Sequence, residues 1–115
     1  MTDHERELLK WVAEELLGWR RMSDAKGGRY SDGDGRWWLD ELGSWHGIGL
    51  VVEEMQRRGC KWHFESYLQT KKHNYPCEKV RRFQFEFIGP PSGKATSEKP
   101  WFAVYEAARK AVTND

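Results

Sequence analysis

The sequence lacks the features that mark disulfide-rich, zinc-binding and membrane proteins. Its 115 residues include only two cysteines, Cys60 and Cys77, with no Cys-x-x-Cys pair and no cluster of cysteine and histidine. We therefore expect two reduced thiols, no metal site and no cofactor. No apolar run approaches the ~20 residues that span a membrane. Residues 1–10 are charged and do not resemble a secretory signal, so we expect a cytoplasmic protein without membrane contact.

An excess of positive charge is also missing. Lys and Arg total 19, against 18 Asp and Glu. A protein that coats nucleic acid would be far more basic, so we expect no bulk nucleic-acid binding. The charge is nevertheless uneven, because residues 60–94 contain seven Lys or Arg and only three Asp or Glu. This basic segment is compatible with a local anion site.

Aromatic side chains, in contrast, are abundant. They make up 14% of the residues and include seven Trp. Buried aromatic rings contribute large apolar areas, so we expect some of them in the core of a single domain that spans residues 1–115. The surplus over what a small core needs is available for a ligand, a protein partner or a subunit interface.

Hydrophobic spacing predicts an α+β fold in the order α-β-β-α-β-β-α. The predicted elements are helices at 3–17, 44–58 and from Pro100 onward, and strands near 19–22, 36–39, 60–68 and 80–88. The segments 69–79 and 89–99 are predicted to be loops. We expect one antiparallel sheet of about four strands packed with the three helices. Its predicted core contains Val51, Trp62, Phe64, Phe83 and Phe85.

Two glycine-containing strings resemble known ligand loops. Residues 89–96 resemble a phosphate-binding loop, but three residues rather than four separate the glycines, and Ala95 follows the Lys. We therefore expect a Pro/Gly loop that at most contacts an anion through Ser92, Lys94 and Thr96. Residues 32–35 resemble the start of a calcium loop, but the twelfth position is Gly43 instead of Glu, which favours a β-turn.

The start of the middle helix is the most promising ligand site. Ser44 is a good N-cap, and unpaired amide groups at a helix start favour phosphate. Trp45 is suited to stack on a base, and His46 to bond to a phosphate or ribose oxygen; alternatively, Trp45 folds back as a hydrophobic staple. Trp37 and Trp38 must face opposite sides of their strand, so one lies outside the core. The predicted ligand-binding residues are Trp38, Ser44, Trp45, His46, Arg82 and Lys94.

The order of elements and several strings resemble the phage ABA-sandwich domain family of small phage-encoded proteins. The matching strings are Glu14–Trp19, Trp37–Asp40, Ile48–Met55 with Arg58-Gly59, Phe83–Phe87, and Pro100 with Ala107–Val112. The resemblance covers most of the chain and implies a phage protein in the host cytoplasm. It implies no catalytic residues.

These observations predict a non-enzymatic protein that binds and sequesters a nucleotide-derived host immune signal. A cyclic or conjugated ADP-ribose and a cyclic dinucleotide are the expected ligand types, and the protein would act as an anti-defence sponge. The alternatives are a protein-interaction module that inhibits or adapts a host or phage protein, and a phosphodiesterase that cleaves such signals. We also expect a homo-oligomer, most simply a dimer, because the two long strands leave a sheet edge or face to cover.

Overall fold

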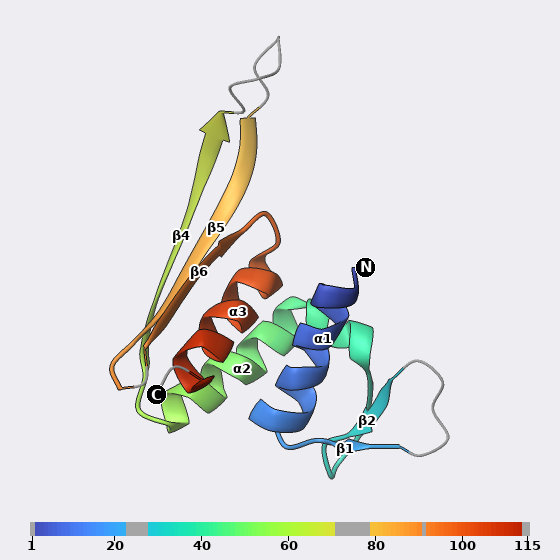
Figure 1. Cartoon of the computed structure of the whole chain (residues 1–115). Coiled ribbons are helices and arrows are strands. Elements are labelled where there is room, and N and C mark those ends of the chain that lie inside the picture. Colours follow the sequence, from blue (N-terminus) through green and yellow to red (C-terminus); the bar gives the residue numbers. More distant parts are fainter. Residues whose placement is uncertain (1, 23–27, 71–78, 91, 114–115) are drawn as a thin grey trace.

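The computed structural model describes residues 2–22, 28–70, 79–90 and 92–113, and it has an α+β fold (Figure 1). Its elements are α1 (Asp3–Trp11), a π-helical segment (Val12–Leu16), β1 (Arg20–Arg21), β2 (Arg29–Ser31), β3 (Arg36–Trp38), a 3-10 helix (Leu39–Gly43), α2 (Trp45–Arg57), β4 (Lys61–Thr70), β5 (Lys79–Ile88), β6 (Gly93–Ser97) and α3 (Pro100–Thr113). The three predicted helices are therefore confirmed.

The N-terminal helix begins where the sequence predicts, but α1 ends at Trp11 and the rest of the predicted helix, Val12–Leu16, is π-helical. Thr2 and Glu5 form a capping box, in which the Thr2 hydroxyl accepts from the Glu5 amide at 3.1 Å. Such a cap satisfies amide groups that the first helical turn leaves unpaired. The chain leaves the helical region at Gly18, whose φ of +67° suits a residue without a side chain. Leu8 and Leu9 point from this helix into the core.

Three short strands follow as a separate antiparallel sheet in the order β1-β2-β3. The turn between β2 and β3 is the β-turn predicted at 32–35, with the Asp32 amide donating to the Gly35 carbonyl at 3.2 Å. The Asp32 carboxylate also accepts from the Asp34 and Gly35 amides. Tyr30 is fully buried in the middle strand and anchors this small sheet to the core.

The larger sheet has the order β4-β5-β6, and all its pairs are antiparallel. The register runs without interruption from Lys61 opposite Ile88 to Thr70 opposite Lys79. Since β6 pairs only with residues 83–87 of β5, the distal half of the β4–β5 hairpin extends beyond the rest of the sheet as an arm (Figure 1).

Helix α3 packs closely on the inner face of this sheet. Phe85 and Phe87 of β5 point toward the helices and are buried. At Gly93 a side chain would overlap the backbone of α3 at Ala107 and Ala111, so the close approach of strand and helix requires glycine. Ala95, the next inward position of β6, is also small and buried.

Two predictions about the sheet and one about the core are wrong. The strands form two three-stranded sheets instead of one sheet of about four. The segment 89–99, expected as a loop, contains β6. In the predicted core, Val51 and Phe85 are buried and Phe64 and Phe83 are half-buried, but Trp62 is 47% exposed. Trp62 does point to the inner face, but β4 lies at the edge of the sheet, where the helices do not cover it.

Candidate functional site

The six predicted ligand-binding residues do not converge on one site. Ser44, Trp45 and His46 lie together at the start of α2, while Arg82 lines a different pocket. Lys94 lies on the outer face of β6, where its side chain is exposed. Trp38 is 45% exposed on β3 and lies under the Arg29 guanidinium, whose carbon is 4.8 Å from the ring centre.

The start of α2 has the local structure that the sequence predicts. The Ser44 hydroxyl accepts from the Gly47 amide at 3.2 Å and donates to the Glu41 carbonyl at 2.6 Å, so it acts as the N-cap. Trp45 is 66% exposed, which excludes the buried staple as its role. The His46 ring packs edge-on against Trp37, with 4.9 Å between ring centres.

An open pocket of about 420 Å³ lies beside Trp45 and His46 and is completed by Gly49, Leu50 and Glu53. Of the described residues that line it, Glu53 is the one Asp, Glu, Lys or Arg. This part of the pocket therefore offers an aromatic surface for stacking but no Lys or Arg for a phosphate.

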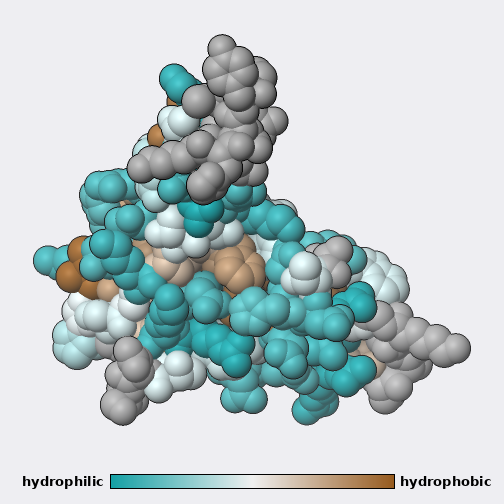
Figure 2. All heavy atoms as spheres, turned by 45° about the horizontal axis from the view of Figure 1, so that its top comes forward, coloured by the Kyte–Doolittle hydropathy of each residue, from teal (hydrophilic) through white to brown (hydrophobic). Residues whose placement is uncertain are grey.

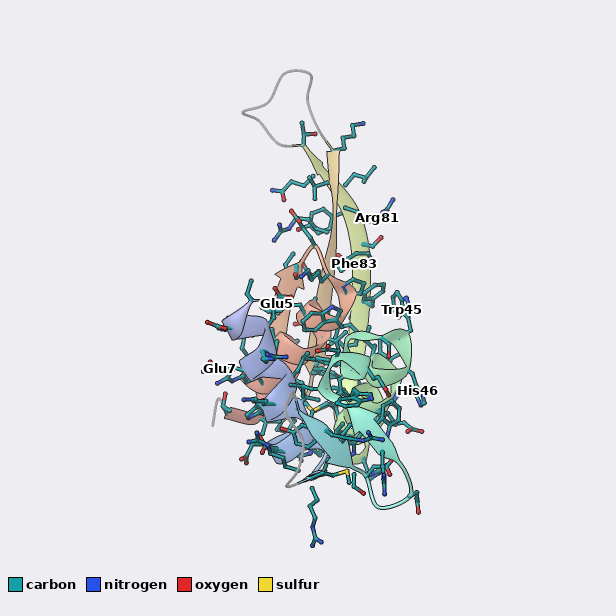
Figure 3. All side chains as sticks on the ribbon, turned by 90° about the vertical axis from the view of Figure 1, so that its right-hand side faces the viewer. Glu5, Glu7, Trp45, His46, Arg81 and Phe83 are labelled. Carbon is teal, nitrogen blue, oxygen red and sulfur yellow. The ribbon has the colours of Figure 1, made fainter. Side chains whose placement is uncertain are left out.

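A second pocket, which we call the N-terminal pocket, combines cations, hydroxyl groups and aromatic rings. It has a volume of about 330 Å³ and is lined mainly by residues from the start of α1, from the end of β6 and from the link between β6 and α3. Its lining residues are Thr2, His4, Glu5, Arg82, Thr96, Ser97, Glu98, Lys99 and Phe102. In Figure 3, Glu5 lies on the opposite side of the molecule from Trp45 and His46, so the two pockets are separate.

Lys99 and Arg82, which both line the N-terminal pocket, form ion pairs of different closeness. Lys99 Nζ donates to Glu5 Oε2 at 2.6 Å, and this hydrogen bond is the main reason why the pKa of Glu5 lies below its ordinary value. Arg82 is held more loosely, since its Nη1 lies 3.9 Å from Oε1 of the exposed Glu98. Arg82 is therefore the less tightly paired of the two cations.

An aromatic pair forms the side of the pocket next to α3. The His4 and Phe102 rings lie 5.6 Å apart between their centres at a tilt of 54°. His4 Nε2 also lies 3.9 Å from the carboxylate of Glu106, one helical turn after Phe102. A flat ring could stack on this pair while its charged group reaches Arg82.

Most residues of this pocket were missed in the sequence. Arg82 was predicted as a ligand residue, and Thr96 was named as a possible anion contact, but both were assigned to other sites. Glu5 and Lys99 are 94 positions apart, and neither lies in a motif that indicates ligand binding. Only the capping box at Thr2 gives a local signal, and it indicates a helix start rather than a binding site.

Other predicted features have no role in this pocket. The Ser92 hydroxyl is used within its own turn, where it bonds to Gly89. Cys60 is buried, and burial raises the pKa of its thiol; Cys77 lies outside the described residues. Among the residues that the structure describes, no group of three or more His, Cys, Asp or Glu could hold a metal ion, and no helix is long and apolar enough to cross a membrane.

Comparison with known proteins gives no match. No family model, curated protein or solved structure matches this chain. The resemblance to the phage ABA-sandwich family therefore stays a prediction from the sequence.

Proposed function

We propose that this protein binds a small nucleotide-like anion in the N-terminal pocket and does not catalyse its conversion. The observation that carries the proposal is that Arg82 and the His4–Phe102 ring pair lie around one pocket of about 330 Å³. Ligand pockets commonly measure ~300–1,000 Å³, so this pocket suits one nucleotide unit. A phosphate would bind Arg82 in place of Glu98, and a base would stack on the rings.

The biological role that fits this chemistry is sequestration. A phage protein that withholds a nucleotide-derived immune signal in the host cytoplasm needs tight binding and no turnover. Support for this role comes from the pocket chemistry together with the resemblance to small phage proteins. Cyclic or conjugated ADP-ribose and cyclic dinucleotides are the ligand classes to test first.

Adjacent arginines on β5 provide a matched pair of variants. Arg82 lines the pocket, whereas Arg81 points to the other face of the strand and donates from Nη1 to the Ser66 hydroxyl at 2.7 Å. Calorimetry should therefore show that R82Q weakens nucleotide binding by about tenfold or more, while R81Q changes it less than about twofold. Both variants remove one positive charge, so a general electrostatic effect would move them equally.

Three results would contradict the proposal. The first is that none of the nucleotides binds more tightly than about 10 µM. The second is that R81Q and R82Q lose the same affinity. The third is that the nucleotide released by heating is chemically altered, which would instead support the phosphodiesterase alternative.

A protein-interaction module is the second candidate, and the exposure of Trp45 favours it. Exposed aromatic residues are common at the centres of protein interfaces. In Figure 2, tan apolar side chains lie beneath the arm and are enclosed by teal polar ones. If this candidate is correct, W45A should abolish binding of the partner protein and R82Q should leave it unchanged.

A further inference from the structure

The outer edge of β4 is unusually suited to pair with another strand. β4 has ten residues, and among the strands that the structure describes it pairs only with β5, so its other edge presents backbone donors and acceptors that no described strand uses (Figure 1). Natural sheets protect such edges with short strands, prolines or bulges. β4 contains no proline or glycine, and its pairing with β5 has no bulge. The opposite edge of the sheet, β6, has only five residues.

The inner face of β4 leaves apolar side chains partly uncovered. Trp62 and Leu68 point to the same face as the buried Phe85 and Phe87, yet they are 47% and 54% exposed. Phe64 lies between them and is half-buried against Phe83 and Phe85. Helix α3 packs mainly on β5 and β6. A neighbour along the edge of β4 would therefore cover apolar surface that the chain itself does not bury.

The outer face of β4 has an order of polar side chains that is complementary to itself. Lys61, His63 and Glu65 follow one another on this face, and His63 Nε2 lies 2.8 Å from Glu65 Oε1. If a second β4 runs antiparallel with Phe64 on the two-fold axis, His63 faces the partner subunit's Glu65, and the reciprocal pair forms as well. An imidazole and a carboxylate directly across the pair are hydrogen-bonding partners, whereas like charges in that position are destabilising.

We propose that two copies of this chain pair through their β4 strands to form a homodimer with one continuous six-stranded antiparallel sheet. A two-fold axis across the edge brings the same residues of both subunits together. The partner covers the free backbone edge and the exposed inner-face side chains at the same time. The N-terminal pocket is lined by residues of β6, which forms the opposite edge of the sheet, so pairing through β4 leaves the pocket open. This inference therefore does not rest on the proposed function.

Charge reversal at Glu65 tests the dimer. Light scattering should find a species of twice the 13.6 kDa chain mass at about 50 µM for the natural chain. E65K should weaken dimerisation by about tenfold or more because it removes the carboxylate that faces the partner's His63 and sets an ammonium group there instead. E7K is the matched control, because Glu7 is exposed on α1, far from β4 in Figure 3. It should leave the dimer intact.

A mixing experiment separates loss of pairing from loss of folding. At a concentration low enough for both chains to be monomeric, E65K should have nearly the melting temperature of the E7K control, because both Glu65 and its neighbour His63 are more than half exposed. Mixing E65K with the doubly substituted K61E/H63E chain should restore a heterodimer, detected by native mass spectrometry. A natural chain that is monomeric at about 100 µM, or an E65K chain that dimerises as well as E7K, would overturn the inference.

Discussion

The contact between β6 and α3 at Gly93 gives a sharp test of the fold. A Cβ added at Gly93 would overlap the carbonyl oxygen of Ala107 and lie 2.5 Å from the backbone nitrogen of Ala111. Backbone atoms cannot rotate away as a side chain can, so the strand or the helix would have to move. Overpacking typically costs ~1–3 kcal/mol, and we place G93A at the upper limit, about 3 kcal/mol. For a domain of this size, that lowers the melting temperature by about 12 °C.

Gly49 provides the control, because it lies inside α2 with open space around it. A Cβ there would meet nothing within 4 Å. Alanine is favoured over glycine in a helix interior by about 0.5–1 kcal/mol, so G49A should raise the melting temperature by about 2–4 °C. Thermal unfolding followed by circular dichroism would measure both variants. If G93A melts at or above the temperature of the natural chain, the packing of α3 directly on β6 is wrong.

Two further variants test the pocket wall and the start of α2. The hydrogen bond from Lys99 lowers the pKa of Glu5. The ionised Glu5 carboxylate therefore stabilises the folded chain at neutral pH, and this stabilisation is lost as the pH falls through the lowered pKa. The stability difference between the natural chain and E5Q, measured by urea unfolding, should therefore shrink in acid; a constant difference would contradict this. W45A should cost less than about 1 kcal/mol and F85A about 3–5 kcal/mol, and equal losses would show that Trp45 is part of the core.

The sequence predicted the helices well because the residues that specify a helix lie close together in the chain. The middle helix begins after Ser44, whose side chain caps a neighbouring amide, and it buries Ile48, Val51 and Met55 on one face. A cap and a stripe of period 3.6 specify this arrangement without help from distant residues. The same reasoning held for the β-turn at 32–35.

Alternation of period two identified the inner face of β4 but did not show what covers it. Trp62 and Phe85 both point inward and stack with 5.7 Å between ring centres. Phe85 lies on the central strand under α3 and is buried, whereas Trp62 lies on the edge strand and stays half exposed. The order of strands in a sheet depends on long-range pairing, and one sequence does not reveal it.

The strand β6 was missed for a related reason. Its first two inward positions are Gly93 and Ala95, which look like loop residues because strands usually carry larger side chains. They are small because α3 approaches closely. This contact joins residues that are distant in the sequence, so a comparison of neighbouring residues does not reveal it. The N-terminal pocket depends on the same β6–α3 link, so it was missed together with the strand.

The two proposed surfaces use different faces and edges of one sheet, and β5 connects them. The phenylalanines of β5 fix the strand to the helices, while Arg82, on the alternate face, reaches the N-terminal pocket. The edge of β4 is separated from that pocket by the width of the sheet. A substitution at Glu65 therefore changes the dimer without touching a ligand contact, and R82Q does the reverse. If R82Q instead weakened both ligand binding and dimerisation, the two surfaces would have to be coupled through β5.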